Sequence, residues 1–397
     1  MKKRGLLIDN LDLHGLEIAP SQGWGGVRLV PLLRTNVRED LRLARREYDE
    51  NLSVVSLDGE LLGAGLKYLS YIPHGLVVSW SDDDQPAAAF GTHVFKPDGQ
   101  RFGNACFSAR VLHRMVKREG ENRLRMLPMH LAMEGFLALY FEGPDIAWSE
   151  YSRQALAHGL SPRGETSISG WGIPGLADAL RVFEIHDNQV GMLIFVADAL
   201  ASAFVVSHPD DYRAIHRSLI EDFYGELLWH YGRLPPTGHL SKLHMDDTRV
   251  SSMADLRREL SVMREEWASF LGFMASDLLG RSVASAPVYK AGPFMLQRFM
   301  TNLDLDRDNH IGEAMIREDG TLEYLKTYRL SAAQTRRAYL LSQLAKQNWN
   351  LDATAAALKV GLDALIQRLE NAGFAYILKP EIVRASRWRR AKGLTAH

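Results

Sequence analysis

The sequence predicts an α+β fold, in which strands dominate the first half of the chain and helices dominate its last third. Short runs rich in β-branched residues at 27–33, 52–57 and 75–80 are bounded by Gly, Pro and Asp, which is typical of strands. Apolar residues recur at helical spacing over 256–278 and again after residue 339. Because strands and helices are grouped along the chain, the pattern disfavours a doubly wound parallel sheet.

The composition is that of an ordinary soluble globular protein, with 46% apolar and 24% charged residues. The 397 residues are enough for two or three domains, and the net charge of −1 argues against a protein that coats nucleic acid along its whole length. Cys106 is the sole cysteine, which excludes an intramolecular disulfide and a cysteine-based zinc cluster, and we expect a buried thiol. We expect a cytoplasmic protein, because no stretch resembles a signal peptide or a membrane span.

Three apolar runs at 180–185, 189–196 and 201–206 predict an antiparallel meander with short connections. Asp210 or Asp211 is suited to cap the amphipathic helix that follows. In that helix, apolar residues recur at helical spacing, namely Ile215, Leu219, Ile220, Phe223, Leu227 and Tyr231.

Upstream of the meander, the apolar segment 127–141 predicts a helix that runs through the core. His130 and Glu134 share one face of it, and a hydrogen-bonded core pair explains them better than a metal or acid/base pair, because further ligands are missing. The glycines of 145–174 do not follow the spacing of a phosphate-binding loop. We therefore predict no catalytic, cofactor-binding or metal-binding residues.

Segments 26–33, 54–63 and 189–196, together with the helix after the last of them, resemble the ARPP domains. These are bacterial modules named for their association with ADP-ribosylglycohydrolase and rhodanese-phosphatase proteins. The resemblance covers residues 14–232. It implies an α+β module tied to regulation or biological conflict, and it brings no catalytic residues with it.

The two prolines within 233–238 mark a domain boundary. Beyond it, Ser251 or Ser252 is suited to cap a long helix. Its apolar residues share one face, namely Leu256, Leu260, Met263, Trp267, Phe270, Leu271, Met274 and Leu278. That face either packs against the body of the protein or forms the seam of a homodimer.

The acidic segment Asp304–Glu313 matches a calcium loop in part, since aspartates fall at its first, third and fifth positions. However, Asn309 stands at the sixth position in place of Gly, and Met315 stands at the twelfth in place of the bidentate Glu. We therefore predict a solvated acidic turn. A hairpin that turns at Asp319–Gly320 follows it.

Three short helices follow at the spacing of a helix-turn-helix. Ser331 and Asn350 are suited to cap the first and the second, and Gly373 is suited to end the third. The order of residues 355–356, 358–360, 364–365 and 369 resembles the Fis-type helix-turn-helix at the end of bacterial enhancer-binding activators, which implies DNA binding. Lys359 stands where that family has a turn glycine.

On the third helix we expect five exposed polar residues: Asp363, Gln367, Arg368, Glu370 and Asn371. The two acids weaken contact with phosphates, and the basic tail compensates for them. The predicted DNA-binding residues are Lys359, Gln367, Arg368, Asn371, Lys379, Arg384, Arg387, Arg389, Arg390 and Lys392.

These patterns divide the chain into an ARPP-like domain at 1–235, a connector at 236–328, a helix-turn-helix at 329–378 and a basic tail at 379–397. We expect a non-enzymatic bacterial protein, homodimeric, that binds DNA as a regulator or as an accessory of a conflict system. Two other functions stay open. One is an adaptor whose helix-turn-helix serves dimerisation or partner binding, and the other is a hydrolase assembled from His130, Glu134 and scattered residues.

Overall fold

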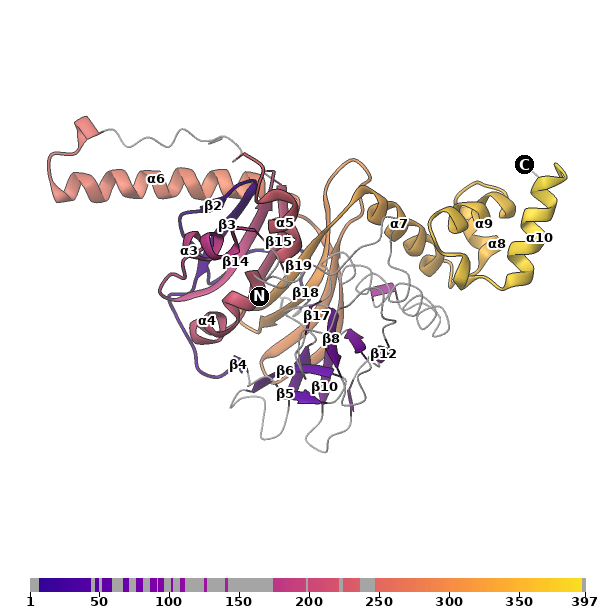
Figure 1. Ribbon diagram of the computed structural model, residues 1–397, viewed down its shortest axis with the longest axis horizontal. Helices are drawn as coiled ribbons and strands as arrows, with labels where there is room; N and C mark the ends of the chain where they lie inside the picture. Colours follow the sequence, from indigo (N-terminus) through magenta and orange to yellow (C-terminus); the bar gives the residue numbers. More distant parts are fainter. Residues whose placement is uncertain are drawn as a thin grey trace, which may run out of the picture.

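A computed structural model describes residues 7–43, 174–235 and 247–394, apart from residues 198 and 221–223. Between residues 47 and 141 it describes nine strands and the helical pair Tyr140–Phe141. The protein is α+β, as predicted, with an antiparallel sheet at its centre and helices at both ends of its long axis (Figure 1).

The largest sheet has nine strands, and all neighbouring strands in it are antiparallel. Its order is β1–β3–β14–β15–β19–β18–β17–β16, and β2 pairs with β3. The bounds are β1 Glu17–Ile18, β2 Gln22–Trp24, β3 Val27–Leu33, β14 Gln189–Val196, β15 Ala199–Val205, β16 Val283–Ala291, β17 Phe294–Thr301, β18 Asn309–Arg317 and β19 Leu322–Leu330.

Two smaller antiparallel sheets come from the segment between β3 and β14. One contains β4 Arg42–Leu43, β5 Glu47–Asp49, β6 Leu52–Asp58, β7 Lys67–Ser70, β10 Thr92–Phe95 and β11 Arg101–Phe102. The other contains β8 Leu76–Trp80, β9 Pro86–Phe90, β12 Ser108–Arg110 and β13 Arg125–Met126. The strands predicted at 27–33, 52–57 and 75–80 are thus confirmed, whereas Cys106, His130 and Glu134 lie outside the described residues.

Two predicted hairpins are confirmed within the large sheet. Strands β14 and β15 pair directly, and β18 and β19 turn at Asp319–Gly320, where Gly320 has a φ of +91°. A short pairing of Phe204 with Lys326 and of Val205 with Leu325 joins β15 to β19. Strands more than 100 residues apart in the chain therefore share one sheet.

Two expectations for the meander region were wrong. The segment expected as a strand at 180–185 instead begins inside the helix α3 Leu176–Val182, because Leu176, Ala179 and Phe183 place a buried helical stripe against the core. The single helix expected after the meander is interrupted. It forms α4 Pro209–Ser218 and α5 Gly225–Tyr231. The N-cap of α4 is His208 and not the expected Asp210 or Asp211, which lie in its first turn.

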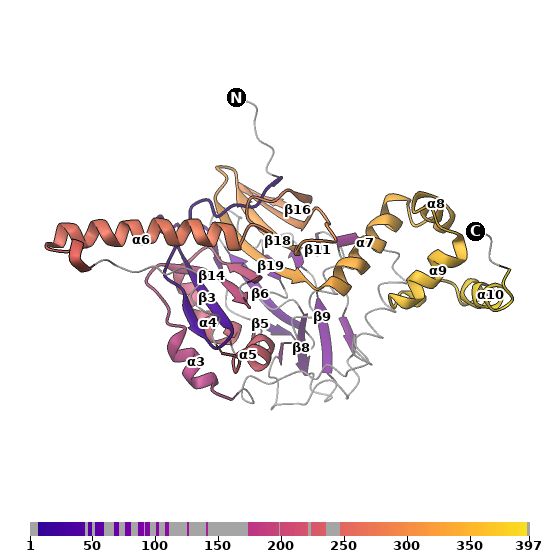
Figure 2. The same cartoon turned by 90° about the horizontal axis from the view of Figure 1, so that it is seen from above.

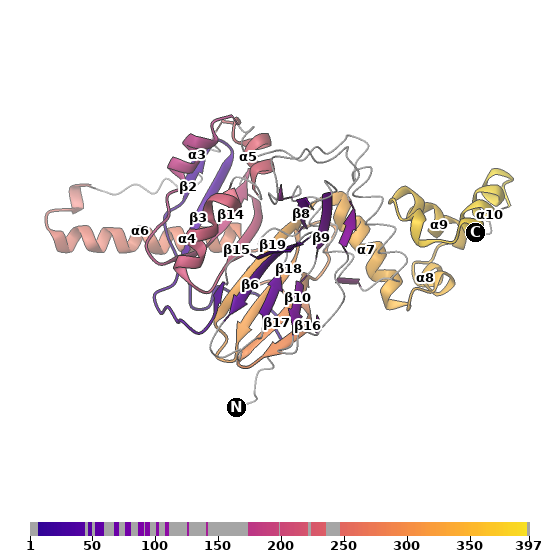
Figure 3. The same cartoon turned by 60° about the horizontal axis from the view of Figure 1, so that its bottom comes forward.

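Hydrophobic cores form on both faces of the large sheet. On one face α3, α4 and α5 cover β3 and β14 (Figure 3), and the same core continues to Ala338 and Leu365 of the carboxy-terminal helices. On the other face, the amino-terminal segment around Leu11 and the chain after α6 Met253–Met274 contribute, the latter through Ala275 and Leu278. Among the described helices, none combines the length and the hydrophobicity that a membrane span requires.

The remaining helices lie outside the sheet. Helix α6 extends away from one end of the body, and the carboxy-terminal helices stand at the opposite end (Figures 1 and 2). They are α7 Ala332–Lys346, α8 Leu351–Ala357, α9 Leu362–Asn371 and α10 Pro380–Ala391, with a short 3-10 turn at Ala375–Ile377.

Candidate nucleic-acid interface

Helices α7 and α8 begin at the residues that the sequence predicts. Ser331 forms a capping box with Gln334: its Oγ accepts from the Gln334 backbone N–H at 3.2 Å, and the Gln334 Oε1 accepts from the Ser331 N–H at 2.9 Å. The Asn350 Oδ1 accepts from the Ala353 N–H at 2.9 Å and caps α8. Local capping therefore fixes where both helices start.

Residues 358–361 connect α8 to α9. Lys359 within them has a φ of +53°, a left-handed conformation that usually favours glycine. The side chain of Lys359 is exposed, so the connection presents a cation to solvent. Gly373, with a φ of +81°, follows α9 and ends it as predicted.

Helix α9 has one buried face and one exposed face. Leu365, Ile366 and Leu369 are buried, whereas Gln367, Arg368 and Asn371 are exposed. Three of the predicted reading residues therefore lie together on the solvent face of one helix. Their amide and guanidinium groups are the types that pair with base edges in the major groove of DNA.

The two acidic residues of α9 do not lie on this exposed face, contrary to expectation. Asp363 is buried, and the side chain of Glu370 is only 10% exposed. Arg389 binds Asp363 through two donors: Nη2 lies 2.7 Å from Oδ1, and Nε lies 2.9 Å from Oδ2. These hydrogen bonds from Arg389 are the main reason why the pKa of the Asp363 carboxyl is lower than its ordinary value.

Glu370 is held from the same side by two further arginines. Its Oε1 accepts from Arg387 Nε at 2.7 Å, and its Oε2 accepts from Arg390 Nη2 at 2.5 Å. An open groove of about 480 Å³ lies beside these pairs and is also lined by Asn371. Both carboxylates of α9 are thus neutralised within the protein, which removes the repulsion that they would exert on a phosphate.

The arginines come from α10, which the sequence had indicated only as a basic tail. Pro380 occupies the first turn of this helix, and Val383 and Ser386 are buried where it packs on the preceding helices. Trp388 is 57% exposed, and the Lys392 Nζ lies 5.3 Å from the centre of its ring. The described tail is therefore a docked helix whose outer face is basic and aromatic.

Charge is concentrated in this end of the chain. Residues 331–397 contain eleven Lys and Arg against four Asp and Glu, a net charge of +7, whereas residues 1–330 carry a net charge of −8. Lys379, Arg384 and Lys392 are exposed and form no ion pair with any carboxylate that the structure describes. A local positive field of this kind attracts a polyanion, although the whole chain is nearly neutral.

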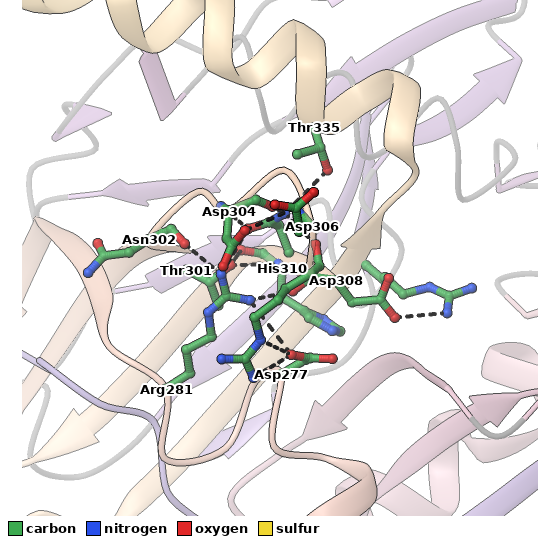
Figure 4. Close-up of polar contacts among 12 residues, drawn as sticks. Asp277, Arg281, Thr301, Asn302, Asp304, Asp306, Asp308, His310 and Thr335 are labelled. Carbon is green, nitrogen blue, oxygen red and sulfur yellow. Dashed lines mark hydrogen bonds and ion pairs between the residues drawn. The ribbon is translucent and has the colours of Figure 1, made fainter.

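The acidic segment 304–308 is closed by protein groups (Figure 4). The guanidinium of Arg281 donates to the carbonyl oxygens of Asp308 and Asn302 and, at 3.1 Å, to the Asn309 Oδ1. The Asn309 Nδ2 donates to the Asp304 carbonyl at 2.6 Å. A fixed cation and an amide side chain thus hold the turn together, and no cluster of potential metal ligands occurs among the described residues.

A second polar feature escaped the sequence analysis. Arg298, Glu313 and Lys326 stand side by side on β17, β18 and β19, and all three are buried. The Arg298 Nε donates to Glu313 Oε1 at 3.2 Å, and burial lowers the pKa of Lys326 well below its usual range. A charged residue in a strand ordinarily indicates a side that faces solvent. The burial of these three residues therefore becomes apparent only in the folded sheet. A shift of one residue between β17 and β18 would separate Arg298 from Glu313, so this buried ion pair favours the observed register.

Comparison with known proteins gives one match. The family model ARPP-2 matches residues 11–292, which is well over half of the chain and extends beyond the 14–232 of the resemblance noted from the sequence. No curated protein and no solved structure matches the chain. Helices α7 to α10 lie outside the matched residues.

Proposed function

We propose that this chain, which belongs to the ARPP-2 family through residues 11–292, binds duplex DNA with its carboxy-terminal helices. In this proposal α8 and α9 form a Fis-type helix-turn-helix, and α9 enters the major groove. The observation that carries the proposal is the exposed face of α9, which presents Gln367, Arg368 and Asn371 while both of its acids turn toward arginines of α10.

The chemistry of these side chains separates base contacts from phosphate contacts. Arg368 is suited to a bidentate contact with guanine, and Gln367 and Asn371 are suited to adenine. Lys359 lies at the connection before α9, and Lys379, Arg384 and Lys392 have no described carboxylate partner. These four cations are suited to phosphates on either side of the groove. Exposed Trp388 among those cations adds an aromatic surface to the same face.

The ARPP-type body would then give the DNA-binding end its biological context. We propose that the protein is a bacterial regulator or an accessory of a conflict system and that it is not itself an enzyme. An effector or a partner protein bound by the body would act on DNA occupancy through the sheet, to which α7 is directly attached.

Selection from a pool of random duplexes tests the proposal. The full-length protein should enrich a sequence, and Arg368→Ala should weaken binding to that sequence by roughly 1–3 kcal/mol. Arg336→Ala is the matched control, because Arg336 is also an exposed arginine but lies on α7, away from the proposed reading face.

Two outcomes count against the proposal. Equal loss for both variants would show that Arg368 contributes only bulk charge. A protein that enriches no sequence, yet captures a protein partner through residues 331–378, would favour the adaptor function in place of DNA reading.

A further inference from the structure

Helix α6 stands out from the body with little protein around it. Its 22 residues span about 33 Å, and none of its described side chains is buried. Met253, Leu260 and Val262 are 65%, 40% and 44% exposed. Figures 1 and 2 both show the helix leaving the sheet, with only its carboxy-terminal end near the body. Because an isolated helix gains little stability in water, a helix of this length needs a partner.

The spacing of its apolar residues is that of a coiled coil. Steps of three and four residues alternate over three heptads, which places apolar side-chain types at a and d positions throughout. These positions are Met253, Leu256, Leu260, Met263, Trp267, Phe270 and Met274, of which Met274 packs against the core of the body. Such a seam is the sequence signature of a helix that pairs with another helix of similar length.

The flanking charges identify the partner and its direction. The e positions carry arginine at 257 and 264, and the g positions carry glutamate at 259 and 266. In a parallel pair, a g position faces the e position five residues on, so Glu259 would face Arg264 of the other helix. In an antiparallel pair, e faces e and g faces g, which would oppose arginine with arginine and glutamate with glutamate.

We propose that α6 pairs in parallel with α6 of a second copy of this chain, with Leu260 on the seam. The same patch then serves both partners, as a two-fold axis along the coil requires. This pairing goes beyond DNA binding and does not depend on it, so a dimer that binds no DNA would leave the inference intact.

Equilibrium sedimentation of the full chain across a range of micromolar concentrations tests the pairing. Leu260→Glu should raise the dimer dissociation constant at least tenfold. Val262→Glu is the matched control, because Val262 is equally exposed but lies at a c position, off the seam. Neither residue is buried within the single chain, so both variants should keep the folded body, which near-ultraviolet circular dichroism can check.

Glu259→Arg tests the direction, because the two orientations predict opposite signs. In the parallel pair, Glu259→Arg places arginine against Arg264 and should raise the dissociation constant several-fold. The double variant Glu259→Arg with Arg264→Glu should restore the wild-type dissociation constant. In an antiparallel pair, the arginine of Glu259→Arg would face Glu266 and tighten the dimer. A wild-type monomer at all concentrations, equal effects of Leu260→Glu and Val262→Glu, or a tighter Glu259→Arg dimer would overturn the inference.

Discussion

The salt dependence of DNA binding tests the assignment of charges at the carboxy-terminal end. Counted from the sequence, six Lys and Arg between residues 379 and 392 would all be available to phosphates. The structure divides them into two groups. Three arginines bind the carboxylates of α9, and Lys379, Arg384 and Lys392 have no described carboxylate partner.

The expected magnitude follows from this division. Each phosphate neutralised contributes about −0.9 to the slope of log K against log salt on duplex DNA. Replacing Lys379, Arg384 and Lys392 together with Gln should therefore make the slope shallower by about 2.7. If the paired arginines were also free, the six cations together would account for about 5.4.

Fluorescence anisotropy with a duplex of mixed sequence, between about 50 and 200 mM salt, measures the slope. The matched control replaces Arg181, Arg213 and Lys290 with Gln, since these are three exposed cations of the body and the change in net charge is the same. An unchanged slope for the carboxy-terminal variant, or an equal change for both variants, would refute the reasoning.

Three further predictions concern stability and metal binding. Burial lowers the pKa of His310 from 6.5 to about 3, so the folded state favours the neutral ring. The contribution of His310 to the free energy of unfolding should be complete above pH 6.5 and should fall by about 3 kcal/mol by pH 4.5. Denaturant unfolding of a His310→Leu variant should lack that part of the pH dependence, and an identical slope would contradict it. Asp363→Asn should accelerate amide exchange in α10 at pH 7, whereas the exposed control Asp352→Asn should leave it unchanged. In the wild type, the ion pair of Asp363 with Arg389 should persist above the ordinary aspartate pKa and be lost as pH falls through the lowered pKa of Asp363. Calorimetry should detect no calcium binding at micromolar calcium, and a tight isotherm abolished by Asp304→Ala would show the acidic segment to be a site after all.

Features set by neighbouring residues were predictable from the sequence. Asn350 caps α8 and Gly373 ends α9, because both depend on hydrogen bonds and dihedral angles within a few residues. The hairpin at Asp319–Gly320 was predictable for the same reason. The exposure of Arg368 on α9 also follows from helical periodicity, whereas the covering of Asp363 and Glu370 by α10 does not.

Features set by distant residues were not predictable in this way. Arg389 and Asp363 are 26 residues apart, and nothing in either segment indicates that a helix at 380–391 would turn back onto α9. The pairing of β15 with β19 joins residues about 120 positions apart, as Phe204 and Lys326 show. The local pattern also predicted a strand at 180–185, where the structure has the end of helix α3. A short apolar run fits a strand and a helix equally well until its packing partners are known.

The two candidate interaction elements are both attached directly to the large sheet. Helix α7 begins two residues after β19 ends, and its Ala338 and Leu341 belong to the core that also contains Tyr328 of β19. At the other end, α6 leads through the buried Leu278 into β16. Short, packed connections of this kind leave little freedom between the elements and the body. In a dimer paired through α6, the sheet would therefore set the separation of the two α9 helices. Under the proposed function, half-site spacing on DNA would then depend on the ARPP-type body as well as on the carboxy-terminal helices.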